Sequence, residues 1–464
     1  MKFPNDFTFG VSTASYQIEG NGFADGRGIC IWDTFAATPG KVADGDNGDV
    51  ACDHYNRYKQ DIALMKELGV DAYRFSIAWP RLFPQGNSHR EQRGFDFYNR
   101  LIDELLANDI KPLATLYHWD LPQSIEDLGG WADRSIVAKF TDFGIAAAEA
   151  FADRVTDWIT INEPWCVSWL GYGNGVHAPG RQDLDAAVAA AHHTAMAHGA
   201  ASKAMKLVAP HVRTGLAINM TTYRVEDEAD KNLTDLRTLM DGELNRWWLD
   251  SSMYGQYPQA TAEAFGERLT KVLHDGDLEV AHSPLDFLGV NYYSDSFLGL
   301  PRPEDKPAIE GGLFPFPQRA SGDVPEPRTD MGWPVTPRGL YDLLVRIKND
   351  WPEITDIAVT ENGAAYPEEP NAEGIVEDDR RVEYLVSHMN SVAEAAADGV
   401  PISAYFYWSL LDNFEWAEGY RKRFGIVHVD YSTQKRTIKK SGYVFRDLIA
   451  EHKSSCMSLA ESRV

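Results

Sequence analysis

Cysteine is scarce in this chain of 464 residues, and long apolar runs are missing. None of its four cysteines (Cys30, Cys52, Cys166 and Cys456) belongs to a CxxC pair of the kind that binds zinc or exchanges disulfides. Four cysteines are too few to stabilise a chain of this length through disulfide bonds, so we expect free thiols. No uncharged stretch could span a bilayer, and the N-terminal "MKFPNDFTFG" lacks the apolar core of a signal peptide. A cytoplasmic location is therefore the expectation.

Positive charge is also in short supply. Lysine and arginine number 44 against 69 acidic residues, which gives a formal net charge of −25. Such a chain repels phosphate backbones and anionic lipids, so we expect neither nucleic acid nor a membrane as a partner. The composition, 44% hydrophobic and 12% aromatic, is typical of a globular protein with a large core.

Cofactor signatures are absent or lie in the wrong context. The histidines of "AAAHHTAMAHGAA" (189–201) lack the i, i+3 or i+4 spacing of ligand pairs on one helix face. "DGDNGD" (44–49) begins like a calcium loop but has Tyr55 where the twelfth position requires glutamate. "GYGNG" (171–175) follows no strand, unlike a dinucleotide fingerprint. We expect no metal and no organic cofactor.

Apolar, β-rich runs alternate with helical patterns along the chain. The expected strands are 7–13, 70–77, 110–118, 155–162, 213–219, 285–293, 354–362 and 402–409. The clearest helical patterns are 54–69, 95–109, 336–351 and 382–399. Eight apolar strands alternating with helices predict a parallel (β/α)8 barrel.

No linker divides the chain, so we expect one domain over 1–464, with a flexible tail from about 455. The Pro- and Gly-rich segment 294–335 follows the sixth strand, where it should form a loop over the C-terminal face of the barrel. Loops on that face build the active sites of such barrels.

Polar residues stand at or just after the ends of the strands. They are Gln17, Arg74, His118, Asn162, Glu163, Asn219, Tyr293, Glu361 and Trp408. Because parallel strands deliver their C-terminal ends to one rim, Glu163 in "ITINEPW" and Glu361 in "AVTENGA" should face each other across a pocket. Two facing carboxyl groups without a metal or a phosphate loop favour hydrolysis of a glycosidic bond. A strand-end glutamate alone would be weak evidence, and the other polar strand ends strengthen it.

The chain resembles glycoside hydrolase family 1, the β-glucosidases in the broad sense, from about residue 3 to about 450. The blocks that carry the resemblance are "FTFGVSTASYQIEG" (7–20), "YRFSIAWPR" (73–81), "LYHWDLP" (116–122), "TINEPW" (160–165), "GVNYY" (289–293), "TENG" (360–363) and "YWSLLDNFEWAEGYRKRFGIVHVD" (407–430).

The resemblance implies a retaining mechanism in which Glu361 is the nucleophile and Glu163 the general acid/base, their carboxyl groups roughly 5–5.5 Å apart. It also implies which residues bind the sugar in the first subsite: Gln17, His118, Asn162, Tyr293, Trp408, Glu415 and Trp416. Arg74 is expected to support Glu361, although a structural ion pair inside the barrel is an alternative. Asn219 is a weaker assignment because "LAINMTT" matches the family loosely.

Several alternatives stay open at this point. Relatives that act on 6-phosphorylated sugars lack a glutamate at the position of Glu415, so its presence favours a neutral sugar. Glucose, galactose and fucose are not separable from the sequence, and both a monomer and a homo-oligomer are compatible with it. A non-catalytic sugar-binding barrel or an endo-acting cellulase are further alternatives. The presence of both glutamates favours an enzyme, and the long loops and the first-subsite residues near 415 favour a closed pocket. We therefore expect an exo-acting β-glucosidase that releases glucose from cellobiose-like or aryl and alkyl β-glucosides.

Overall fold

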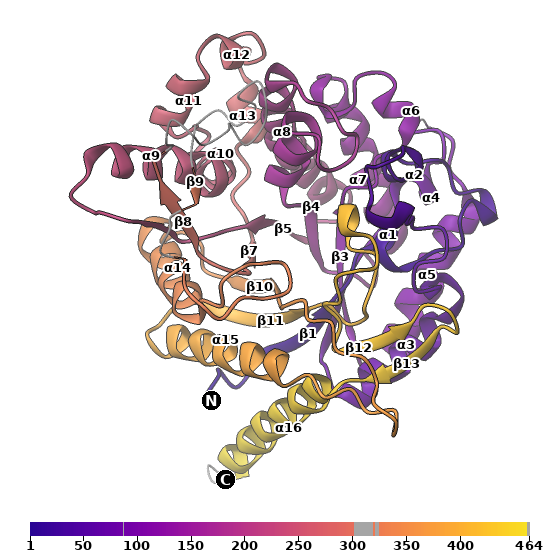
Figure 1. The fold of residues 1–464 in the computed structure, drawn as a ribbon. Coiled ribbons are helices and arrows are strands. Elements are labelled where there is room, and N and C mark those ends of the chain that lie inside the picture. The colour runs from indigo at the N-terminus through magenta and orange to yellow at the C-terminus, as the bar shows by residue number, and fades with distance from the viewer. Residues whose placement is uncertain (87, 301–318, 321–323, 462–464) are drawn as a thin grey trace.

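A closed barrel of eight parallel strands forms the centre of the molecule in a computed structural model that describes residues 1–86, 88–300, 319–320 and 324–461 (Figure 1). The strands pair in the order β1–β11–β10–β7–β5–β4–β3–β2. They are β1 (Thr8–Ser12), β2 (Ala72–Ser76), β3 (Lys111–Tyr117), β4 (Asp157–Asn162), β5 (Arg213–Asn219), β7 (Phe287–Asn291), β10 (Ile357–Asn362) and β11 (Ile402–Trp408). Each lies within the range expected from the sequence, so the (β/α)8 prediction is confirmed.

Helices surround the barrel and connect successive strands, as Figure 1 shows. The main ones are α3 (His54–Leu68), α5 (Gln92–Ala107), α7 (Ile136–Phe151), α8 (Leu184–Val208), α14 (Pro337–Asp350), α15 (Asp379–Ala397) and α16 (Lys440–Glu461). Their sequences explain them: α5 buries Tyr98, Leu101, Ile102 and Leu105, which share one face at helical spacing. Helix α3 ends at Gly69, whose left-handed conformation is the usual helix stop.

Shorter elements form the loops. They are the helices α1 (Ser15–Ile18), α2 (Ile31–Ala37), α4 (Trp79–Leu82), α6 (Gln123–Glu126), α9 (Lys231–Asp241), α10 (Trp247–Tyr254), α11 (Gln259–Phe265), α12 (Glu267–Thr270) and α13 (Asp277–Ala281). Two π-helical segments, η4 (Cys166–Gly173) and η5 (Gly242–Arg246), follow β4 and α9. Four 3₁₀ turns are η1 (Ala24–Gly26), η2 (Ala43–Gly45), η3 (Gly130–Ala132) and η6 (Trp416–Glu418). The strands β12 (Val427–Asp430) and β13 (Lys435–Ile438) form an antiparallel hairpin.

The segment expected as a loop at 294–335 contains two short strands, β8 (Ser296–Gly299) and β9 (Arg319–Ala320). They form a small sheet with β6 (Tyr223–Val225). Residues 301–318 and 321–323 of the expected loop lie outside the described residues. Helix α16 continues to Glu461, across most of the segment expected to be a flexible tail. No helix among the described residues has the length and apolarity needed to cross a membrane.

One layer of side chains fills the inside of the barrel, and seven strands contribute to it. Its members are Ala72, Leu113, Ile159, Ala217, Phe287, Ala358, Ala404 and Phe406. The eighth strand, β1, contributes Gly10 beside Phe406. A Cβ added at Gly10 would lie 2.3 Å from the Phe406 ring and 2.9 Å from the backbone oxygen of Ala72. The absence of a side chain at Gly10 is therefore what makes room for the Phe406 ring.

Gly10→Ala is expected to destabilise the fold by about 1–3 kcal/mol, because the added methyl overpacks a closed barrel. The matched control is Gly144→Ala inside α7, where an added Cβ finds its nearest neighbour at 3.4 Å, an ordinary contact. There alanine should be neutral or stabilising by up to about 1 kcal/mol, since glycine weakens a helix interior. Urea unfolding of both variants measures the difference, and equal midpoints would contradict this account of the barrel packing.

Candidate active site

A cavity of about 850 Å³ opens at the C-terminal ends of the barrel strands. Eight of the residues expected at this site line it: His118, Glu163, Asn219, Tyr293, Glu361, Trp408, Glu415 and Trp416. Gln17, Arg74 and Asn162 are fully buried in contact with lining residues or with one another. The barrel thus brings together side chains from all eight strands or from the loops that directly follow them.

Glu361, at the end of β10, is surrounded by hydrogen-bond donors. Arg74 donates from Nη1 to its Oε1 at 2.6 Å, and Tyr293 donates from its hydroxyl to Oε2 at 2.6 Å. Burial raises the pKa of Glu361, and the Arg74 charge together with hydrogen bonds from Tyr293 and Arg74 opposes that rise. Of the two expected roles for Arg74, contact with Glu361 is the one that the geometry favours.

Glu163 has a different environment at the junction between β4 and η4. Asn291 donates from Nδ2 to Oε1 at 2.8 Å, and the Cys166 thiol donates to Oε2 at 3.2 Å. Burial first, and then repulsion from Glu361, raise the pKa of Glu163 to about 8. Its backbone is left-handed, with φ of 46°, a conformation that costs a non-glycine residue free energy and that the surrounding structure must hold in place.

Glu415 lines the cavity together with Glu163 and Glu361, and it is half-buried. Burial and then the charge of Glu361 raise its pKa to about 8 as well. Of the cations in the described ranges, only Arg74 forms an ion pair with any of the three glutamates. Because a buried charge without a partner is costly, one ionised and two protonated carboxyl groups are the favoured state near neutral pH. Glu361 is the group whose surroundings favour ionisation.

Asn162 connects these groups to the opposite side of the cavity. Its Oδ1 accepts from Arg74 at 2.6 Å and from Asn291 at 2.9 Å, and its Nδ2 donates to the Nε2 atom of His118 at 3.1 Å. Burial holds the pKa of His118 well below its usual range, so the imidazole is neutral. This network fixes the orientation of Asn162 beside Glu163.

Aromatic side chains enclose the same cavity. His118 stacks on Trp408 at 5.7 Å and on Trp416 at 5.9 Å between ring centroids. Trp119 and Trp416 have left-handed backbones, with φ of 80° and 51°, and their rings lie 4.6 Å apart. Flat indole surfaces beside hydrogen-bonding groups suit the apolar face and the hydroxyl groups of a sugar ring.

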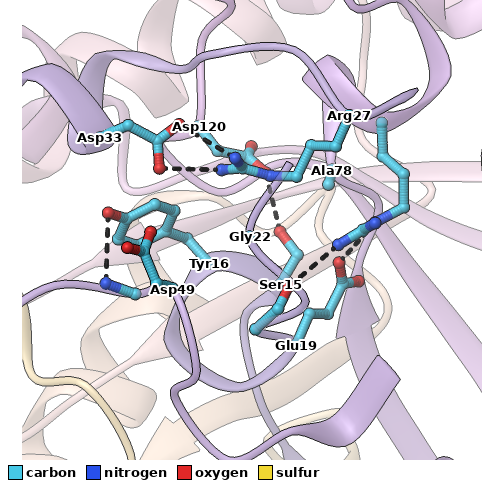
Figure 2. A pocket seen from close by; sticks show the side chains of 12 residues that line it. Ser15, Tyr16, Glu19, Gly22, Arg27, Asp33, Asp49, Ala78 and Asp120 are labelled. Carbon is cyan, nitrogen blue, oxygen red and sulfur yellow. Dashed lines mark hydrogen bonds and ion pairs between the residues drawn. The ribbon is translucent and has the colours of Figure 1, made fainter. Parts of the chain in front are cut away.

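A small polar pocket connects two loops that carry expected site residues (Figure 2). Ser15, in the helix that also carries Gln17, donates from its hydroxyl to Asp120 at 2.8 Å, and Asp120 follows His118 and Trp119 in sequence. Ion pairs between Arg27 and Asp33 at 3.0 Å, and between Arg81 and Glu19 at 2.9 Å, complete its walls. The Ser15–Asp120 hydrogen bond thus joins the first and third βα loops, and the Arg81–Glu19 ion pair joins the first loop to the second.

Asn291 is a site residue that the sequence analysis did not single out. It lies in the block "GVNYY", where Tyr293 was chosen, and its position at the end of β7 could have revealed it. The contact between Cys166 and Glu163 could have been found from their i, i+3 spacing at a helix start. Of the tryptophans not assigned to the first subsite, Trp119, Trp165 and Trp333 also line the cavity, whereas Trp131 is fully buried elsewhere.

Replacing a carboxyl group whose pKa is raised in the folded protein should stabilise the protein in a pH-dependent way. Because the pKa values of Glu163 and Glu415 are about 8 in the folded protein and near the ordinary 4.5 after unfolding, each group costs stability as the pH rises from about 4.5 to about 8. Glu163→Gln and Glu415→Gln should therefore each gain about 1–3 kcal/mol over the wild type at about pH 8.5, and much less at about pH 5.

Chemical unfolding at the two pH values measures this gain, with Glu149→Gln on the surface as the control. A gain in stability that is equal at both pH values, or as large in the control, would contradict the raised pKa values of Glu163 and Glu415.

Comparison with known proteins agrees with this geometry. A family model described as glycosyl hydrolase family 1 matches residues 1–454. β-Glucosidase A of Thermotoga maritima is 44% identical over 448 residues, 97% of this chain and 98% of that protein. A bifunctional β-D-glucosidase/β-D-fucosidase of Bifidobacterium breve is 40% identical over 473 residues, 97% of this chain and 99% of that protein.

Among solved structures, the psychrophilic β-glucosidase of Micrococcus antarcticus superimposes with a TM-score of 0.92 at 43% identity, over 98% of each chain. A family model that covers nearly the whole chain, and relatives this similar over their full lengths, leave one conclusion: the chain belongs to glycosyl hydrolase family 1.

Proposed function

We propose that this protein is a retaining exo-β-glucosidase, in which Glu361 is the nucleophile and Glu163 the general acid/base. The observation that carries the proposal is the contrast between these two buried glutamates of one cavity. Arg74 and Tyr293 contact Glu361 and favour its ionised form, while burial and the neighbouring charge favour the protonated form of Glu163. Such a pair is what double displacement requires.

In the first step the Glu361 carboxylate attacks the anomeric carbon, and the bond from that carbon to the glycosidic oxygen breaks. Glu163 gives its proton to the departing oxygen, so the alcohol leaves neutral and Glu163 becomes ionised. The product is a glycosyl ester on Glu361 with inverted configuration. For this step to proceed we expect the two carboxyl groups to lie roughly 5–5.5 Å apart.

In the second step the ionised Glu163 takes a proton from water, and the water oxygen attacks the anomeric carbon. The ester bond to Glu361 breaks, which restores both groups and releases a sugar of the original β configuration. The charge of Glu361 disappears when the ester forms, and so does its repulsion of Glu163. The pKa of Glu163 therefore falls between the two steps, as its change from acid to base requires.

The sugar in the first subsite is proposed to bind Gln17, His118, Asn162, Tyr293, Trp408, Glu415 and Trp416. Asn162, held beside Glu163 by Arg74 and Asn291, is placed to contact a hydroxyl next to the anomeric carbon. The neutral His118 can exchange hydrogen bonds with another hydroxyl. Asn219 keeps a lesser role at the edge of the cavity.

A neutral sugar fits this subsite better than a phosphorylated one. A 6-phosphate near Glu415 would meet a carboxyl group instead of a cation, and a buried phosphate without a cation is costly. We propose β-glucosides and cellobiose-like oligosaccharides as substrates, and the name of the Thermotoga maritima relative, a β-glucosidase, supports that choice. Activity on β-fucosides is a second candidate, which the name of the Bifidobacterium breve relative supports.

Glu361→Gly should lower turnover of an aryl β-glucoside by on the order of 10⁴-fold or more, because the nucleophile is lost. Azide, small enough to enter the vacated space, should restore turnover and give an α-glucosyl azide, since a single displacement inverts the configuration. The anomer of the azide is read by proton NMR.

A panel of aryl β-glucoside, β-fucoside, β-galactoside and β-6-phosphoglucoside identifies the sugar for the wild type. The phosphorylated substrate should be turned over least. A β-glucosyl azide, or no rescue by azide, would overturn the role given to Glu361, and an inactive wild type would favour a non-catalytic sugar-binding barrel.

A further inference from the structure

The two oxygens of Glu163 have different partners, and this difference favours one of them as the site of its proton. Asn291 Nδ2 donates to Oε1 at 2.8 Å. The orientation of that amide is fixed, because its Oδ1 accepts from the hydroxyl of Thr360 at 2.7 Å. An amide NH₂ can only donate, so Oε1 accepts; because the carbonyl oxygen of a neutral carboxyl group is a better acceptor than its hydroxyl oxygen, this contact favours the proton on the other oxygen. The favoured site of the proton of neutral Glu163 is therefore Oε2, the oxygen that the Cys166 thiol contacts at 3.2 Å.

A thiol suits an oxygen that alternately holds and loses a proton. Sulfur is a weak acceptor and S–H a weak donor. When Glu163 is neutral, Cys166 can accept from the Oε2 hydroxyl, and when Glu163 is ionised, the thiol can turn its hydrogen to Oε2. Because both interactions are weak, neither state is strongly trapped, which is what a group that must give and then take a proton needs.

The backbone holds the thiol in this position. Cys166 is the first residue of η4 and follows Glu163 by three positions, so the two side chains lie on one face of the turn. The N–H of Val167 donates to the Glu163 carbonyl at 3.2 Å and closes that turn. Cys166 is only 7% exposed, yet it lines the cavity and also borders a small aromatic pocket that contains Trp32 and Tyr117. It is thus packed on one side and faces Glu163 on the other.

We propose that Cys166 is a positioning residue for the proton on Glu163: its thiol holds Oε2 in place and partners that oxygen in both the protonated and the ionised form. This inference rests on the acid/base role proposed for Glu163. It assigns a part in the reaction to a side chain that would otherwise be only a small buried residue.

The pH dependence of Glu163 gives this role a measurable consequence. The titratable and charged groups that interact with Glu163 are, besides Cys166, Glu361, Arg74, Tyr293 and Glu415. A donor to the ionised carboxylate lowers its pKa, and the thiol is one such donor, with Asn291 the other. In the wild type kcat/KM should fall as the pH rises through about 8, where Glu163 loses the proton that it must donate.

Cys166→Ala should shift this basic limb of the kcat/KM profile upward by about half a pH unit, because the ionised form loses a donor to a charged oxygen while the neutral form loses only a weak sulfur acceptor. Cys166→Ser, which keeps a donor, should return the limb to the wild-type position or below it. Cys456 is a free cysteine near the C-terminus that contacts Asn5, and Cys456→Ala should leave the limb unchanged. A limb that stays in place in Cys166→Ala, or that moves equally in the Ala and Ser variants, would overturn the proposal.

A second measurement needs no variant to be active. The S–H stretching band of Cys166 is identified in the infrared spectrum as the band that Cys166→Ser loses. In the wild type this band should shift to lower frequency as the pH rises through the titration of Glu163. The same band in Glu163→Gln should not respond to pH. A band that is insensitive to pH in the wild type would overturn the proposal even if azide rescue of Glu361→Gly succeeds, so the two failures can be told apart.

Discussion

Glu163, Glu361 and Glu415 line one cavity, and among the cations that the structure describes only Arg74 forms an ion pair with any of them. Arg74 contacts Glu361 directly, so Glu361 can be ionised at modest cost, while ionising Glu163 or Glu415 as well would place further negative charge in a site of low polarity. The proposed division of labour between nucleophile and acid follows from this imbalance. It keeps Glu361 ionised, as a nucleophile must be, and Glu163 protonated, as a general acid must be.

The rest of the molecule maintains that imbalance. The closed barrel supplies the strand ends that bring β2, β4 and β10 to one rim, and the packing of its interior holds them there. Asn162 and Asn291 fix the positions of the carboxyl groups through hydrogen bonds without adding charge. The left-handed backbone at Glu163 lowers the stability of the fold locally, and the burial of the carboxyl groups lowers it further. Both losses of stability are offset by a large apolar core of barrel and helices.

The fold could be predicted from the sequence because the spacing of apolar residues identifies a strand or a helix from its own segment alone. All eight barrel strands, and helices such as α3 and α14, lie close to the expected residues. The site residues could be placed on one rim because parallel strands share a direction. Their contacts could not be predicted in the same way, since hydrogen bonds depend on side-chain orientation. Asn291 is the clearest case: it lies in a recognised block, yet only the structure shows that it donates to both Asn162 and Glu163.

Direct observation of the ionisation state of the three glutamates tests this account most sharply. Carbon-13 NMR of protein labelled at the glutamate carboxyl carbon can assign each signal by its loss in Glu163→Gln, Glu361→Gln or Glu415→Gln. The account predicts that near neutral pH Glu361 is ionised, whereas Glu163 and Glu415 are protonated and titrate near pH 8. A protonated Glu361 beside an ionised Glu163 would contradict it.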